Sequence, residues 1–262
     1  MVLRKNSRGV GSRNTNRQEG KDMIDIHSHL IYGMDDGAPT VEESVKMLQQ
    51  AKELGINTIL ATPHFQENLF QLDGIARNFI QMVEKAWEYG ITLKQGCEVY
   101  ISPFVDKLIE EQKMLLLNRA NYILLELPYE SIPLYTYETI YKLQLQRITI
   151  IIAHPERNMN LLKDFRLFVD LLERGCLMQL DAGSIVGAYG RTVKNYARKL
   201  LKLKLVHFVA SDAHCANDYR NWYKQSYEKV RRWAGKKYAD RLYIHNPELI
   251  LENTKESVYE MI

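Results

Sequence analysis

The sequence contains only three cysteines, and this scarcity excludes several classes of protein. Cys97, Cys176 and Cys215 form no C-x-x-C pair and are odd in number, so neither a disulfide framework nor a thiolate zinc site is expected. Long apolar runs are also lacking, because no stretch approaches the roughly 18–20 residues needed to cross a bilayer. The first residues lack the apolar centre of a secretory signal. These absences predict a cytoplasmic protein.

The excess of positive charge is concentrated at the start of the chain. The formal net charge is +3, but residues 1–22 hold six Lys and Arg against Glu19 and Asp22, a contribution of +4 that leaves −1 for residues 23–262. The segment 1–22 has no hydrophobic period and predicts a disordered basic extension. It could touch nucleic acid or an anionic membrane, or be no more than an upstream extension before a start at Met23. The near-neutral remainder lacks the basic stripe of a nucleic-acid binder.

Short β-rich runs alternate with amphipathic stretches from Met23 onward, which is typical of β/α units that build a parallel sheet. The expected strands are residues 23–27, 57–61, 92–97, 122–127, 149–153, 177–180 and 206–211. No Gly-rich dinucleotide fingerprint follows the first strand, so a distorted TIM-like (β/α)7 barrel is favoured over a doubly wound sheet. With 46% hydrophobic and 26% charged residues, residues 23–262 are expected to form a single α/β domain.

Helices are expected between these strands, and several have marked ends. The expected helices are residues 41–54, 75–89, 105–111, 135–146 and 221–234, with a last one opened by Asn246 and Pro247 as cap and first-turn residue. Thr40 and Glu43 have the T-x-x-E spacing of a capping box, which predicts the start of the first helix.

Metal-binding residue types stand at the end of nearly every expected strand. A lone histidine in such a place is more often a hydrogen-bonded core or loop residue. In a parallel β/α barrel, however, the carboxyl ends of the strands meet at one rim, so side chains far apart in the chain would share one pocket. The residues of this pattern are His27, His29, His64, Glu98, Glu126, His154, Asp212 and His214. These eight residues are too many to coordinate one ion, so two or three ions are expected. A ligand set of imidazoles and carboxylates without thiolates suits Zn²⁺, Mn²⁺ or Fe²⁺.

Two arginines are candidates for binding an anion at the same rim. Arg157 follows His154 by three residues, and its planar donors suit phosphate oxygens; the alternative is a structural ion pair with Glu156 or Asp181. Arg220, in the segment after His214, is the weaker candidate. The histidines His207, in mid-strand, and His245, before a helix cap, are out of place for the rim and are interpreted as structural.

Six short segments together resemble a known family. They are DIHSH at 25–29, DDGA at 35–38, ATPH at 61–64, LLELP at 124–128, AHPER at 153–157 and SDAH at 211–214. They resemble the polymerase-and-histidinol-phosphatase (PHP) superfamily. Within it they resemble the manganese-dependent protein-tyrosine phosphatases of Gram-positive bacteria, which are encoded with the tyrosine kinases that control capsule and exopolysaccharide synthesis. The resemblance runs from Met23 to about residue 255.

The resemblance implies a distorted seven-stranded barrel with three divalent ions, of which Mn²⁺ is expected first and Fe²⁺ or Zn²⁺ are alternatives. The implied ligands are His27, His29, Asp36, His64, Glu98, Glu126, His154, Asp212 and His214. Glu98 would bridge two ions, and Glu126 stands where other branches often carry a histidine. The implied partner is a bacterial tyrosine kinase with a phosphorylated C-terminal tyrosine cluster. Ring-shaped oligomers are implied by the family alone, because no residue here determines an oligomeric state.

This resemblance leads to a mechanism in which a metal-bridging hydroxide attacks phosphorus while Arg157 and the ions neutralise the equatorial oxygens. The C-x5-R signature of thiol phosphatases is absent, because the position six residues after each cysteine, where the arginine would stand, holds Pro103, Ala182 or Asn221. Cys97 and Cys215 flank expected ligands where an uncharged polar residue would be usual, which leaves metal preference and redox sensitivity open. The alternatives are a small-molecule phosphatase, such as one for histidinol phosphate, and a non-catalytic metal-binding or nuclease-like module.

Overall fold

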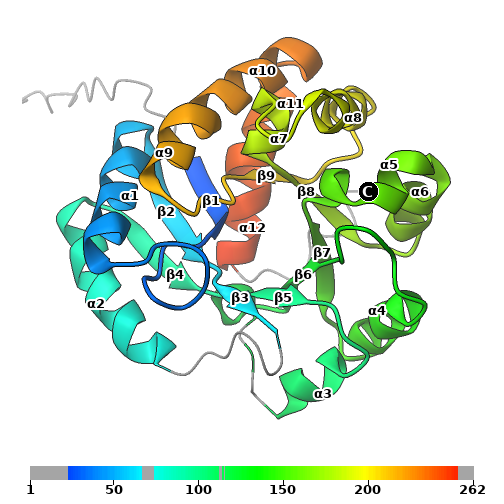
Figure 1. Ribbon diagram of the computed structural model, residues 1–262, viewed down its shortest axis with the longest axis horizontal. Helices are drawn as coiled ribbons and strands as arrows, with labels where there is room; N and C mark the ends of the chain where they lie inside the picture. Colours follow the sequence, from blue (N-terminus) through cyan, green and yellow to red (C-terminus); the bar gives the residue numbers. More distant parts are fainter. Residues whose placement is uncertain (1–22, 67–73, 112–113, 115, 253–262) are drawn as a thin grey trace, which may run out of the picture.

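The computed structural model describes residues 23–66, 74–111, 114 and 116–252. The basic extension expected at residues 1–22 lies outside these residues. Within them, strands surround the centre of the molecule and helices lie on the outside (Figure 1). No helix among the described residues combines the length and the apolar character needed to cross a bilayer.

Nine parallel strands are present in the described part of the chain, and they form two sheets. The three-stranded sheet contains, in order, β1 (Met23–Ser28), β2 (Ile56–Ala61) and β4 (Thr92–Gln95). The six-stranded sheet contains β3 (His64–Phe65), β5 (Glu98–Tyr100), β6 (Tyr122–Glu126), β7 (Thr149–Ala153), β8 (Leu177–Asp181) and β9 (Phe208–Ala210). All pairings between neighbours are parallel, which confirms the predicted α/β class.

Seven of the nine strands match the predicted strand regions, whereas β3 and β5 were not predicted. β3 follows the second predicted region, 57–61, after a break at Pro63, which has no N–H to donate. The third region was predicted as 92–97, but β4 ends at Gln95 and β5 begins beyond the region, after Gly96, where a Cβ would lie 2.7 Å from Leu117. Hydrogen bonds from Gly96 N to Ala61 O (3.0 Å) and from Glu98 N to Pro63 O (3.1 Å) carry the pairing across both breaks.

The last strand region lies beside the first. An isolated parallel bridge joins Ser28 to Ala213, and backbone hydrogen bonds of 2.9 Å run from His29 N to Ala213 O and from Asp212 N to His27 O. The seven regions therefore follow one another around a ring, as a TIM-like arrangement requires. This contact also places the residues after β1 directly against those after β9.

Alternate side chains of the strands enter two separate hydrophobic clusters. Leu124 of β6 and Ile151 of β7 pack in a small cluster with Ile26 of β1 and Phe208 of β9. Their sequence neighbours, among them Leu125 and Ile152, belong to the larger cluster that also contains the helices. The C-terminal helix α12 (Asn246–Glu252) passes behind the strands in Figure 1 and adds Ile250 to the small cluster. The strands are thus buried on both faces, as expected of a parallel sheet.

Helices follow the strands along the outside of this ring. The α-helices before α12 are α1 (Val41–Glu53), α2 (Ile75–Glu88), α3 (Val105–Glu110), α4 (Thr136–Leu145), α5 (Met159–Lys163), α6 (Phe165–Glu173), α7 (Ala182–Val186), α8 (Arg191–Lys202), α9 (Ala216–Asp218), α10 (Lys224–Ala234) and α11 (Lys236–Asp240). Short 3-10 turns η1 (Leu117–Arg119) and η2 (Pro155–Arg157) and π-helical turns η3 (Tyr219–Tyr223) and η4 (Arg241–His245) connect them. The helix predicted at 221–234 therefore begins as η3.

Two predicted helix caps differ from the structure. Thr40 does cap α1, since its Oγ1 accepts from Glu43 N at 3.4 Å, but the Glu43 carboxylate does not return to Thr40 to complete a capping box. Glu43 Oε1 instead accepts from Ala216 N at 3.0 Å. Asn246 is not a cap: its backbone is helical (φ −66°, ψ −43°) because the chain runs from η4 into α12, and its Nδ2 donates to His207 O at 2.6 Å.

Candidate metal centre

The nine residues proposed as ligands all lie together at the carboxyl ends of the strands. They form three overlapping groups, and within each group the candidate ligand atoms lie within 4.8 Å of one another. The groups are His29, Asp36, His64 and His214; His27, His29, Glu98 and Asp212; and His64, Glu98 and Glu126. His154 completes the set, with its Nε2 2.8 Å from Glu98 Oε1. Residues nearly two hundred positions apart thus meet in one centre.

Glu98 lies in the middle of this centre and is fully buried. Its Oε2 is 3.0 Å from His64 Nδ1, 3.2 Å from His27 Nε2 and 3.4 Å from His29 Nε2. Burial alone would raise the pKa of Glu98, but the neighbouring His27 and the hydrogen bond with His154 outweigh it and hold the pKa well below its usual range. Imidazoles from three strand regions thus surround one buried carboxylate.

Several features of the centre fit divalent cations. Glu98 Oε2 and Asp212 Oδ1 are buried oxygens that lie close to imidazole nitrogens, but neither has a hydrogen bond of good geometry among the described residues. Burial and the negative charge of Glu98 raise the pKa of Glu126 to about 7, a repulsion that a cation between the two carboxylates would remove. At the outer edge, Asp36 lies 3.4 Å from His214 Nε2, and this contact lowers the pKa of Asp36 to about 2. Imidazoles and carboxylates without thiolates suit Mn²⁺, Fe²⁺ or Zn²⁺.

Two residues that the sequence analysis did not select hold the imidazoles in place. Asp35 Oδ2 accepts from His29 Nδ1 at 2.7 Å and from His64 N at 2.8 Å, and Gln179 Oε1 accepts from His27 Nδ1 at 3.0 Å. These bonds leave Nε2 of His27 and His29 directed into the cluster, which is how ligating histidines are usually oriented. The sequence could have indicated Asp35, because it precedes the candidate ligand Asp36 in the DDGA segment. Gln179 lies inside a strand, away from the strand ends by which the other candidates were recognised.

The backbone of the centre is tightly constrained. His154 and Asp212 have positive φ values of 31° and 48°, a region that non-glycine residues rarely occupy. A Cβ at Gly37 would overlap the Cβ and carbonyl oxygen of His29, so only glycine lets this loop fold over the histidine. Such strain is common where a fold positions reactive side chains.

Arg157 lies at the edge of the centre. Its Nη1 is 2.7 Å from Asp212 Oδ2 and 3.6 Å from Asp181 Oδ2, and its guanidinium lies 4.5 Å from the centroid of the Tyr189 ring. The alternative ion pair with Asp181 is therefore partly present, while Glu156 instead accepts from Asp181 N at 2.9 Å. Asp181 ends β8, the one strand end that the sequence analysis left without a candidate.

The remaining predicted residues lie elsewhere. Arg220 is exposed on η3, and no contact within the described part of the chain joins it to the centre. His207 Nδ1 accepts from Met178 N at 3.0 Å beneath β9, and the exposed His245 lies 3.4 Å from Glu248. Cys215 caps α9 beside His214.

The fold is that of the PHP-type phosphatases. A histidinol phosphate phosphatase from Lactococcus lactis, solved with zinc, L-histidinol and phosphate, shares the fold with a TM-score of 0.51 at 14% identity and covers 83% of this chain and 94% of its own. That likeness concerns the fold alone.

Within this class the chain belongs to the capsular polysaccharide synthesis family CpsB/CapC, whose model matches residues 23–252. Tyrosine-protein phosphatase YwqE of Bacillus subtilis is 34% identical over 235 residues, covering 88% of this chain and 92% of that protein. Tyrosine-protein phosphatase CpsB of Streptococcus pneumoniae is 30% identical, covering 87% and 98%. A crystal structure from work on these two metal-dependent tyrosine phosphatases matches with a TM-score of 0.81 at 32% identity and covers 89% and 96%. The family resemblance seen in the sequence is confirmed.

Proposed function

We propose that this protein is a metal-dependent tyrosine phosphatase, with residues 23–262 as the phosphatase domain and residues 1–22 as a basic extension before it. The observation that carries the proposal is the position of Glu98, a buried carboxylate among the imidazoles of His27, His29, His64 and His154. The named activity of relatives at 30–34% identity over most of the chain supports it.

The nine residues would hold three ions, with Mn²⁺ the first choice, and Glu98 would join two of them. When bound, such ions supply a hydroxide nucleophile at neutral pH and neutralise charge on the phosphoryl group and the leaving oxygen. Asp35 and Gln179 would keep the imidazoles in place through the bonds to His29 and His27.

Arg157 would bind the equatorial oxygens of the phosphoryl group, where charge accumulates during transfer. The side chain is 29% exposed, so it can reach a ligand at the rim, and Tyr189 supports its guanidinium plane. Arg220 would have to reach the site from an exposed position on η3, and we propose it only as a contact to the substrate chain.

A thiol mechanism has no support in the structure. Cys97 and Cys176 are buried, and burial raises the pKa of Cys176 to about 12. Cys215 lies at the cap of α9, and burial raises the pKa of its thiol as well. Since burial raises the pKa of the Cys176 and Cys215 thiols and no cysteine has the C-x5-R spacing, Cys215→Ser should keep most of the activity.

The shape of the rim favours a phosphorylated protein over a metabolite. The hollow beside Arg157, Glu126 and His154 has a volume of only about 50 Å³, which is enough for a phosphoryl group and too little to enclose a whole metabolite. Tyr129, 59% exposed, lies at the same hollow and offers a surface for a tyrosine ring. Because the family is one of capsular polysaccharide synthesis, we propose that the substrate is the phosphorylated C-terminal tyrosine cluster of a capsule-associated tyrosine kinase.

The test is hydrolysis of a phosphotyrosine peptide from a kinase tail, beside histidinol phosphate, by metal-stripped protein with and without added Mn²⁺. Turnover that requires metal and favours the peptide is the expected result. A preference for histidinol phosphate would be consistent with the metal centre but would show that the enzyme acts on small molecules. If the metal-bound protein hydrolyses neither substrate, the result would instead support a non-catalytic metal-binding module.

A further inference from the structure

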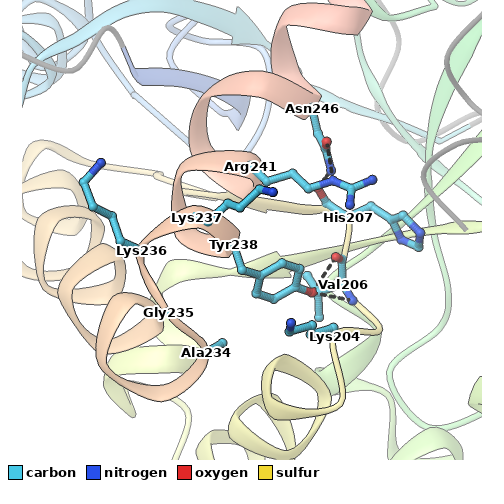
Figure 2. Close-up of a pocket in the computed structure, with 10 residues that line it drawn as sticks. All are labelled: Lys204, Val206, His207, Ala234, Gly235, Lys236, Lys237, Tyr238, Arg241 and Asn246. Atoms are coloured by element: carbon cyan, nitrogen blue, oxygen red, sulfur yellow. Dashed lines mark hydrogen bonds between the residues drawn. The ribbon is translucent and has the colours of Figure 1, made fainter.

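A second cavity lies at the opposite end of the strands from the metal centre. It has a volume of about 420 Å³ and opens beside Val206 and His207, immediately before β9, whereas the candidate ligands Asp212 and His214 follow β9 (Figure 2). Its other walls come from the turn between α10 and α11, from α11 itself, from η4 and from the first residue of α12. A volume of this size is typical of small-molecule sites.

The lining of this cavity is strongly basic. It includes Lys204, Lys236, Lys237 and Arg241 and no Asp or Glu. Figure 2 shows Lys237 and Arg241 on one side of the Tyr238 ring and Lys204 on the other, while Lys236 extends away, with its Nζ 2.7 Å from Asp240. Three cations therefore surround one aromatic wall.

The cavity lies in the most basic stretch of the chain. Residues 191–241 contain 14 Lys and Arg but only four Asp and Glu. The body as a whole is close to neutral, so the rest of it carries a matching negative excess. Since α8 and α11 both pack against α10, these charges share one side of the molecule, and their combined field attracts anions.

The walls of the cavity are held by hydrogen bonds. Tyr238 Oη donates to Val206 O at 2.7 Å and accepts from Val206 N at 3.1 Å, and Arg241 Nε donates to Asn246 Oδ1 at 3.3 Å. His207 Nδ1 accepts from Met178 N, so the proton of the neutral ring is on Nε2. Burial and the nearby Arg241 lower the pKa of His207 to about 4, which keeps the ring neutral. The site is thus formed without a ligand, which reduces the cost of binding.

We propose that this cavity is a second ligand site, separate from catalysis, for a phosphorylated small molecule of the nucleoside diphosphate class. Its phosphates would bind Lys204, Lys237 and Arg241, of which the arginine can donate to two oxygens at once. Its base would pack against the Tyr238 ring. The proposal does not depend on the phosphatase activity, because no residue of the cavity belongs to the metal centre.

Uridine diphosphate glucose is a suitable probe, because it carries a diphosphate but no terminal phosphoryl group for the metal centre to hydrolyse. Calorimetry with the metal-loaded protein should show saturable binding of one equivalent. The double variant Lys204→Gln with Lys237→Gln should bind at least about tenfold more weakly, which corresponds to about 1.4 kcal/mol. The control is Lys202→Gln with Lys224→Gln, which removes the same charge from exposed positions of α8 and α10 outside the cavity.

Binding that is retained by the control and weakened in the cavity variant supports the proposal, provided that turnover of a phosphotyrosine peptide and thermal stability are the same in all three proteins. Uridine alone should not bind. The proposal is overturned if the wild type shows no saturable binding at about 1 mM probe, if the cavity variant binds as tightly as the wild type, or if uridine binds equally well.

Discussion

Nη1 of Arg157 lies 2.7 Å from Oδ2 of Asp212, while Oδ1 of the same carboxylate faces the imidazoles, 3.2 Å from His27 Nε2 and 3.3 Å from His29 Nε2. One carboxylate therefore connects the candidate metal centre to the candidate anion-binding arginine. The positive φ of Asp212 and the backbone bond from its N–H to His27 O hold it in this position.

Replacing Arg157 with Ala should lower turnover by about 10²–10³-fold, because a preorganised donor to the transferring phosphoryl group is lost. Metal content should stay at the wild-type level, since Asp212 keeps its oxygen toward the imidazoles. Steady-state kinetics and elemental analysis on the same samples check both parts. Arg166→Ala, at a 90% exposed arginine paired with Asp164, is the control and should change neither quantity. Full activity in the Arg157 variant would show that the assigned role is wrong.

Replacing Glu98 with Gln should remove bound metal and reduce activity by at least about 10²-fold, because an amide cannot supply the charge of a bridging carboxylate. Elemental analysis after dialysis measures the loss. Glu88→Gln, at an exposed position of α2, should retain the wild-type metal content. A Glu98 variant that binds as much metal as the wild type would contradict the central position given to this residue.

Removal of metal should destabilise the fold, because the carboxylates and imidazoles of the centre are buried close together. Free Mn²⁺ at 100 times its dissociation constant should stabilise the protein by about 2.7 kcal/mol for each independent site. Urea unfolding with chelator and with Mn²⁺ measures the difference. The Glu98→Gln variant should show a much smaller shift, and equal shifts in both proteins would point to binding at other sites.

The stability should fall between pH 7 and pH 5 in part because of His207. Burial and Arg241 lower its pKa to about 4, whereas in the unfolded chain the pKa is about 6.5. At pH 5 the unfolded state binds a proton that the folded state does not, so the free energy of unfolding decreases as the pH falls from about 6.5 to 4. The contribution is about 2 kcal/mol at pH 5.

Urea unfolding of His207→Gln at both pH values should therefore show a smaller decrease than the wild type. His245→Gln, at a 63% exposed side chain, should retain the wild-type decrease. Identical pH dependence in His207→Gln and the wild type would exclude this histidine as the cause.

Glu43→Ala should destabilise the protein by about 1–2 kcal/mol, because a charged acceptor for Ala216 N is lost. Amide exchange at Ala216 should become faster, since this bond holds the segment after His214 against α1. Glu53→Ala, at an exposed position near the end of the same helix, should leave the exchange rate at Ala216 unchanged. Unchanged protection in the Glu43 variant would mean that the bond does not hold this segment.

The amino-acid sequence by itself determined the strand regions and the residue types that end them. Period-two and helical patterns reflect burial of local faces, so all seven strand regions were found, with β7 placed to the residue. The candidate ligands followed from these positions, because the carboxyl ends of parallel strands converge whatever the side chains are. Asp36 does not follow a strand end directly, and it was added to the candidate ligands only because of the DDGA motif and the family resemblance.

Only the tertiary structure decided the contacts between distant segments. Leu117 leaves no room for a Cβ at Gly96, between β4 and β5, and the partner of Glu43 is Ala216, 173 positions away. Gln179 became a support for His27 because the ring of strands brings β8 near β1. The basic cavity likewise joins a turn, a loop and η4. Local patterns record how each segment buries its own face; which polar groups then meet depends on how the segments are packed together.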